Sequence, residues 1–144
     1  MENGKFRVGV AHAQMYKGDR YMEYISTNNA PNAIGPYSQA VKANGLLFTS
    51  GQIAINPKTN TVEAKTIEEQ TTQVCENLKA VVEAAGSSME RVVKTVCFLA
   101  DINDFAAFNE IYGKYFVSKP ARSCVAVKDL PKGVLCEVEL IAEI

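Results

Sequence analysis

The stretch TIEEQTTQVCENLKAVVEAAG, residues 66–86, is the most regular segment of the sequence. Its apolar residues recur at the spacing that one face of a helix requires. Thr66 followed by Glu69 has the pattern of a capping box, and Gly86 is a typical C-terminal stop. The sequence therefore predicts an amphipathic helix that begins after Thr66 and ends before Gly86. The apolar positions that define its face are Ile67, Val74, Leu78, Val81, Val82 and Ala85.

Strand-like segments flank this helix. Residues 45–55, GLLFTSGQIAI, are rich in apolar and β-branched residues and end at the turn-forming NPKTN. Residues 92–100, VVKTVCFLA, predict a second buried strand. The final segments, RSCVAV and LCEVELIAEI, predict two further strands separated by the loop KDLPKG.

Between the strand at 92–100 and the last two strands, aromatic residues recur at helical spacing. They predict a second helix whose aromatic face belongs to the core, capped by Asp101 or Asn103. The stripe comprises Phe105, Phe108, Tyr112, Tyr115 and Phe116. Two amphipathic helices with about five or six strands predict an α+β fold, with one mainly antiparallel sheet that carries both helices on a single face. The other face would then expose apolar side chains, so we expect self-association.

Composition favours one soluble globular domain. The chain has 144 residues, 47% of them hydrophobic, and its net charge is -1. This balance gives no sign of a nucleic-acid partner, and no apolar run approaches the roughly 20 residues that a membrane helix needs. Residues 1–21 form a basic N-terminal arm, interpreted as a leader or a weak targeting segment. We expect a cytoplasmic protein, or a mitochondrial one if the arm is a transit segment.

The cysteines and the single histidine restrict the chemistry. Cys75, Cys97, Cys124 and Cys136 have no metal-binding spacing, and His12 lies in the arm, so no metal site is expected. Four cysteines in apolar segments predict reduced, buried thiols. Without a histidine in the core, no Ser-His or Cys-His nucleophile pair can form there.

The stretch KPARSCVAV places an arginine at the start of an apolar strand. Alternation puts Arg122 on one face with Cys124 and Ala126. If the last two strands form an antiparallel hairpin, a register near 124 opposite 137 also sets Arg122 opposite Glu139. Arg122 could then bind a carboxylate beside a glutamate that moves protons, or it could simply form a structural ion pair with Glu139.

Two other stretches favour a binding site. AIGPYSQAV, residues 33–41, has a rigid Gly-Pro before Tyr37, and TSGQ, residues 49–52, interrupts a strand at Ser50 and Gly51, where glycine allows close backbone approach. Each pattern is also common in ordinary turns.

From about Tyr24 to Ile144 the chain resembles the reactive intermediate deaminase A family, the YjgF-type imine deaminases. The resemblance lies in NAPNAIGPYSQAV, LLFTSGQIAINP, EEQTTQVCENLKAVVEAAG, VVKTVCFLADINDFAAFNEIYGKYF, KPARSCVAV and LPKGVLCEVELIA. It implies a chorismate-mutase-like fold and an imine deaminase domain over residues 22–144. It also implies a homotrimer with ligand clefts between subunits.

The resemblance further implies cofactor-free hydrolysis of reactive 2-imino acids, such as 2-iminobutanoate and 2-iminopropanoate, to 2-keto acids and ammonia. Arg122 would anchor the substrate carboxylate, and Glu137 would lie near the attacking water. Tyr37, Ser50, Gly51 and the backbone of Cys124 would line the cleft, Tyr37 coming from the adjacent subunit. Three alternatives stay open: a keto-acid-binding regulatory module, an endoribonuclease or translation inhibitor, and a chaperone-like holdase.

Overall fold

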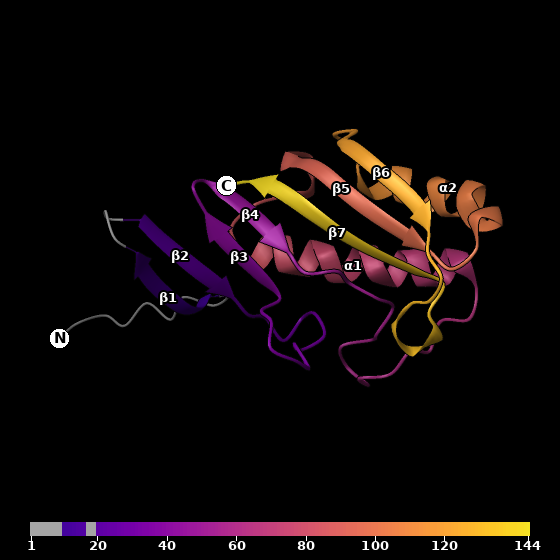
Figure 1. Ribbon diagram of the computed structural model, residues 1–144, viewed down its shortest axis with the longest axis horizontal. Helices are drawn as coiled ribbons and strands as arrows, with labels where there is room; N and C mark the ends of the chain where they lie inside the picture. The colour runs from indigo at the N-terminus through magenta and orange to yellow at the C-terminus, as the bar shows by residue number, and fades with distance from the viewer. Residues whose placement is uncertain (1–9, 17–19) are drawn as a thin grey trace.

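The computed structural model describes residues 10–16 and 20–144. The described chain forms one seven-stranded sheet in the order β1-β2-β3-β4-β7-β5-β6, with α1 and α2 together behind it (Figure 1). Only β5 and β6 pair in parallel; the other strand pairs are antiparallel. The predicted α+β class and mainly antiparallel sheet are confirmed. The strands are β1 Val10–Tyr16, β2 Arg20–Ile25, β3 Ala40–Ala43, β4 Leu46–Thr49, β5 Val92–Leu99, β6 Ala121–Ala126 and β7 Cys136–Glu143.

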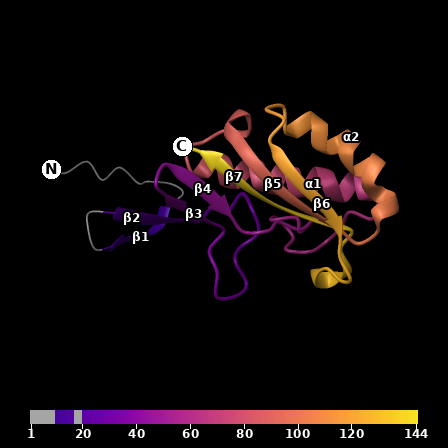
Figure 2. The same ribbon diagram turned by 45° about the horizontal axis from the view of Figure 1, so that its top comes forward.

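The sheet is wider than expected because it extends into the N-terminal arm. β1 pairs with β2, and β2 pairs with β3, so the first two strands widen the sheet at one edge (Figure 2). Residues 1–9 and 17–19 of the arm lie outside the described residues. Whether the arm is a leader or a targeting segment stays a prediction.

Helix α1, Ile67–Ala84, forms as its local sequence predicts. The Thr66 hydroxyl accepts the backbone N–H of Glu69, and the Glu69 carboxylate accepts the N–H of Thr66, which completes the capping box. At the other end Gly86 has φ +82°, a conformation that favours glycine. The helix therefore begins and ends where its capping residues require.

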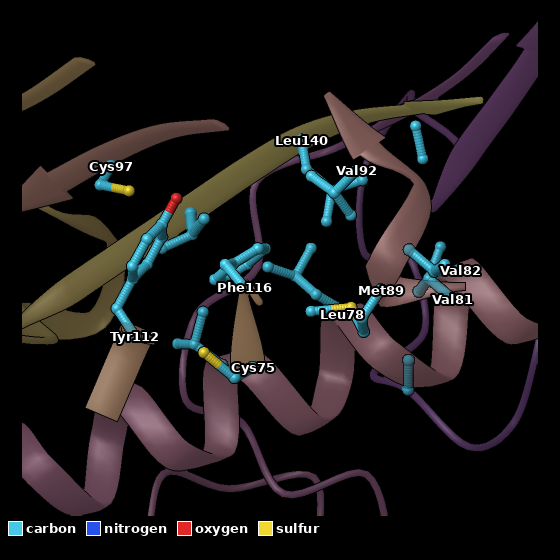
Figure 3. Close-up of a cluster of buried hydrophobic side chains, with 14 of the residues drawn as sticks. Cys75, Leu78, Val81, Val82, Met89, Val92, Cys97, Tyr112, Phe116 and Leu140 are labelled. Carbon is cyan, nitrogen blue, oxygen red and sulfur yellow. The ribbon is translucent and has the colours of Figure 1, made fainter. Parts of the chain in front are cut away.

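Helix α2, Phe105–Tyr115, follows the short 3₁₀ turn η2, Ile102–Asp104. The predicted cap at Asp101 acts on this turn, since its carboxylate accepts the N–H of Asn103 at 2.9 Å. Of the aromatic stripe, Phe108, Tyr112 and Phe116 are buried, but Phe105 is 38% exposed. The core lies between the helices and the sheet, where Leu78 and Val82 of α1 pack near Phe116 and Val92 (Figure 3).

The predicted hairpin of β6 and β7 is wrong. β5, α2 and β6 form a crossover unit, so β6 lies parallel to β5 at the edge of the sheet. β7 inserts between β4 and β5 instead. The loop after β6, which contains the 3₁₀ turn η3, Pro131–Gly133, therefore carries the chain past β5 rather than closing a hairpin.

The sheet face opposite the helices carries apolar side chains. Phe48 is 42% exposed and Val125 is 47% exposed, and the half-buried Val96, Phe98 and Ile141 lie on the same face. The expected uncovered apolar face is thus present in the single chain.

Candidate functional site

A cavity of about 630 Å³ opens beside the start of β7. It is lined by four of the predicted site residues, Tyr37, Ser50, Gly51 and Glu137. Segments far apart in the sequence meet here, because the Gln52 N–H donates to the Val138 carbonyl at 2.9 Å and the Val138 N–H donates back at 3.2 Å. This bridge places Gly51 next to Glu137.

Gly51 is a close-approach glycine. A Cβ at this position would overlap Oε1 of Glu137 and lie 3.0 Å from its Cδ. The Glu137 carboxylate therefore lies directly against the backbone of residue 51. Only glycine leaves room for the carboxylate in this position.

Ser50 connects the cavity floor to the segment that carries Tyr37. Its hydroxyl donates to the Ser38 carbonyl at 2.5 Å, and its N–H donates to the Gln39 carbonyl at 2.9 Å. Tyr37 itself is 50% exposed, and its hydroxyl accepts the N–H of Ile34 at 3.4 Å. The phenol thus lies at the open side of the cavity.

Gln39 is a structural residue of this site that the sequence did not single out. Its buried amide nitrogen donates to the carbonyls of Thr27, Ala30 and Pro31, at 3.0, 3.3 and 2.7 Å, and its Oε1 accepts the Thr27 N–H at 2.7 Å. These bonds fasten the loop that forms one wall of the cavity. The glutamine that follows PYS was the available signal, but its partners are eight to twelve residues away and could not be read from spacing.

The environment of Glu137 suits a proton-transferring carboxyl. Partial burial raises the pKa of Glu137 above its usual value, and the negative charge of Glu139, which lines the same cavity, raises this pKa further. Glutamates with raised pKa values act as acids and bases near neutral pH.

Arg122 and Cys124 lie elsewhere. Arg122 lines a second cavity of about 480 Å³ between β6 and α2, where its Nη1 donates to Asn109 Oδ1 at 2.7 Å. Cys124 is half-buried on the same face of β6, and burial raises the pKa of its thiol, although the charge of Arg122 acts in the opposite direction. Its side chain is therefore a neutral thiol at neutral pH.

The strand register shows that the two cavities belong to opposite faces of the sheet. Arg122 is paired with Thr95, which is buried under the helices. Glu139 is paired with Val96, and Glu137 with Phe98, on the open face. Adjacent residues of a strand point to opposite faces, so within one chain Arg122 cannot reach Glu137.

This arrangement corrects two expectations. Arg122 and Glu139 are not opposite one another, and the structural ion pair between them is absent from the described residues, where Arg122 bonds Asn109 instead. The site residues thus form two separate groups, one around Glu137 and one around Arg122.

The described cysteines are all free: Cys75, Cys97 and Cys136 are buried, and Cys124 is half-buried. No helix in the described part of the chain combines the length and apolar character that crossing a bilayer requires.

Comparison with known proteins agrees with the fold. Residues 27–144 match the Endoribonuclease L-PSP family. A RutC family protein of Pyrococcus horikoshii is 55% identical over 121 residues, which cover 83% of this chain and 96% of that relative. The crystal structure of the E. coli YjgF gene product superposes with a TM-score of 0.79 at 48% identity, covering 83% of this chain and 97% of that one.

The structure of E. coli TdcF with bound serine superposes with a TM-score of 0.80 at 44% identity, covering 84% of this chain and 98% of that one. The chain belongs to the family of Endoribonuclease L-PSP, RutC and YjgF proteins. The family identified from the sequence motifs is confirmed.

Proposed function

We propose that the protein hydrolyses 2-imino acids, such as 2-iminobutanoate and 2-iminopropanoate, to 2-keto acids and ammonia. The observation that carries the proposal is the Glu137 carboxylate held against Gly51 in a cavity that Tyr37 and Ser50 also line. Residues 22–144 would form the deaminase domain, and no cofactor takes part in the reaction.

The chemistry needs one proton shuttle. A water molecule adds to the electrophilic C=N carbon and loses a proton, which Glu137 accepts. The carboxyl returns this proton to the imine nitrogen, which gives a carbinolamine. It then accepts the proton of the carbinolamine hydroxyl as the C=O bond forms and delivers it to the nitrogen as the C–N bond breaks, so that ammonia leaves. A positioned acid-base group of this kind contributes about 10²- to 10⁴-fold to the rate. The raised pKa of Glu137 supports both halves of this role.

The substrate carboxylate would be bound by Arg122 of a neighbouring subunit. One chain holds Glu137 and Arg122 on opposite faces, so a complete site requires a second copy. Arg122 lies on β6, an edge strand, and the open face exposes Phe48 and Val125, two features that favour assembly. We propose a homotrimer with the clefts between its subunits.

The test is a coupled assay. A threonine dehydratase releases the imine, semicarbazide traps it, and added protein competes with the trap by accelerating keto-acid formation. Arg122→Ala should abolish the acceleration while the oligomer persists, whereas the control Arg91→Ala, an exposed arginine outside both cavities, should not. No acceleration by the wild-type protein, or full activity of Arg122→Ala, would contradict the proposal.

Three other functions differ in what they require. The serine bound to TdcF favours a regulatory module that binds a small amino or keto acid without reaction. Such a module needs Arg122 but no proton shuttle, so Glu137→Gln should leave its ligand affinity intact.

The family name favours an endoribonuclease. If the protein has that activity, a preparation free of contaminating nucleases should cleave RNA, and the protein should not accelerate imine hydrolysis. A chaperone-like holdase would protect clients equally well after Arg122→Ala.

A further inference from the structure

The guanidinium of Arg122 is held in place by side chains of α2. Its Nη1 donates to Asn109 Oδ1 at 2.7 Å, and its Cζ lies 4.8 Å from the ring centroid of Tyr112 and 5.5 Å from that of Phe105. A charged hydrogen bond and two ring contacts together restrict the rotamers of the long side chain. The group is thereby oriented before any ligand binds.

The Tyr112 ring, which lies against the guanidinium of Arg122, is itself held in place by the core. The hydroxyls of Tyr112 and Thr95 are 2.7 Å apart in the core, and the Tyr112 ring stacks on Phe116 with centroids 4.3 Å apart. Figure 3 shows the Tyr112 hydroxyl pointing toward the sheet. Tyr112 is therefore a rigid support, which leaves Asn109 as the group that sets the direction of Nη1.

The residues that line the cavity around Arg122 leave its positive charge uncompensated. Among the described residues, the cavity at Arg122 is lined by a second cation, Lys119, and by no carboxylate. Asn109 supplies an acceptor oxygen without a negative charge. An aspartate at the same position would offer the same oxygen and neutralise the arginine.

We propose that Asn109 is a positioning residue, which orients Arg122 through a neutral amide so that the full guanidinium charge remains available to a ligand carboxylate. The inference rests on the proposed anchoring role of Arg122. It adds that the identity of residue 109, amide rather than acid, sets the affinity for the carboxylate.

Two substitutions of Asn109 distinguish the effect of the guanidinium's orientation from the effect of its charge. Asn109→Ala removes the hydrogen bond and should weaken carboxylate binding several-fold. Asn109→Asp keeps the acceptor but pairs with Arg122, so we expect the larger loss, about tenfold or more. In the imine assay both changes should raise KM and leave kcat nearly unchanged, because Glu137 lies on the other face. Asn103→Asp, an exposed site on η2 away from the cavity, is the control for added charge.

The measurement is calorimetric titration of the assembled protein with 2-oxobutanoate, a carboxylate that does not react, with chromatography to check assembly. Weaker binding in the order wild type, Asn109→Ala, Asn109→Asp supports the inference. Wild-type affinity of Asn109→Asp, or tighter binding by Asn109→Asp than by Asn109→Ala, overturns it. So does an absence of 2-oxobutanoate binding by the wild type, or equal binding by Arg122→Ala.

The titration does not depend on turnover. If 2-oxobutanoate binding follows the expected order while no imine is hydrolysed, the inference holds and the proposed function fails. If imine is hydrolysed but Asn109→Asp retains the wild-type affinity and KM, the inference fails and the proposed function holds.

Discussion

Glu137 and Gly51 are in contact: the carboxylate lies where a side chain of residue 51 would begin. The contact follows from the bridge between Gln52 and Val138, which brings the end of β4 beside β7. It fixes the carboxylate at the floor of the cavity.

Gly51→Ala should therefore displace the carboxylate. The methyl group would overlap Oε1, the far end of a flexible side chain, so the side chain can move without unfolding the protein. We expect imine hydrolysis to fall at least tenfold and the melting temperature to change little. Activity assays and thermal unfolding check this. Wild-type activity of Gly51→Ala would argue against a role for the Glu137 position.

The pH profile should depend on Glu139. Glu137 must be ionised to accept a proton from water, so kcat/KM should fall as the pH falls through its raised pKa. Glu139→Gln removes the negative charge that raises this pKa, and the acidic limb should move to lower pH. Measuring kcat/KM between pH 4 and 8 for both proteins, with Glu143→Gln as the control, tests the shift. An unmoved limb would mean that another group controls the rate.

Mixing two inactive variants should restore activity if the site is shared between subunits. Arg122→Ala retains Glu137, and Glu137→Gln retains Arg122, so mixed oligomers contain some complete sites. For random mixing, roughly a quarter of the sites would be intact. Co-refolding the two variants and assaying the mixture checks this against each variant alone. A mixture without activity, despite confirmed mixed assembly, would contradict a shared site.

Cys124→Ala should keep most of its activity. Burial raises the pKa of this thiol, so a thiolate nucleophile is scarce at neutral pH. The expected contact of residue 124 with substrate comes from its backbone, which alanine retains. Steady-state kinetics and chromatography check the prediction. A large loss of kcat with normal assembly would indicate that the sulfur itself participates.

Local signals in the sequence predicted local structure. Thr66, Glu69 and Gly86 set the ends of α1 through contacts within a few residues, so spacing was sufficient. The order of the strands in the sheet could not be predicted from such local signals. Alternation gave the faces of β6 correctly, but nothing in the sequence states that β5 would separate β6 from β7.

The same limit applied to the site. Tyr37, Ser50, Gly51 and Glu137 were named and do line one cavity, yet the separation of Arg122 from Glu137 depends on strand order. Asn109 was not singled out because the arginine it contacts lies thirteen residues further along the chain, on the strand that follows α2.

The bonds of Gln39 have a further consequence for ligand affinity. The wall they fasten loses its conformational freedom when the chain folds, so a ligand entering the cavity need not order that loop. Because the loop is already ordered in the folded protein, binding does not carry the entropic cost of ordering it. A ligand as small as the proposed imino acid makes few contacts, and little of their binding free energy is then lost to this cost.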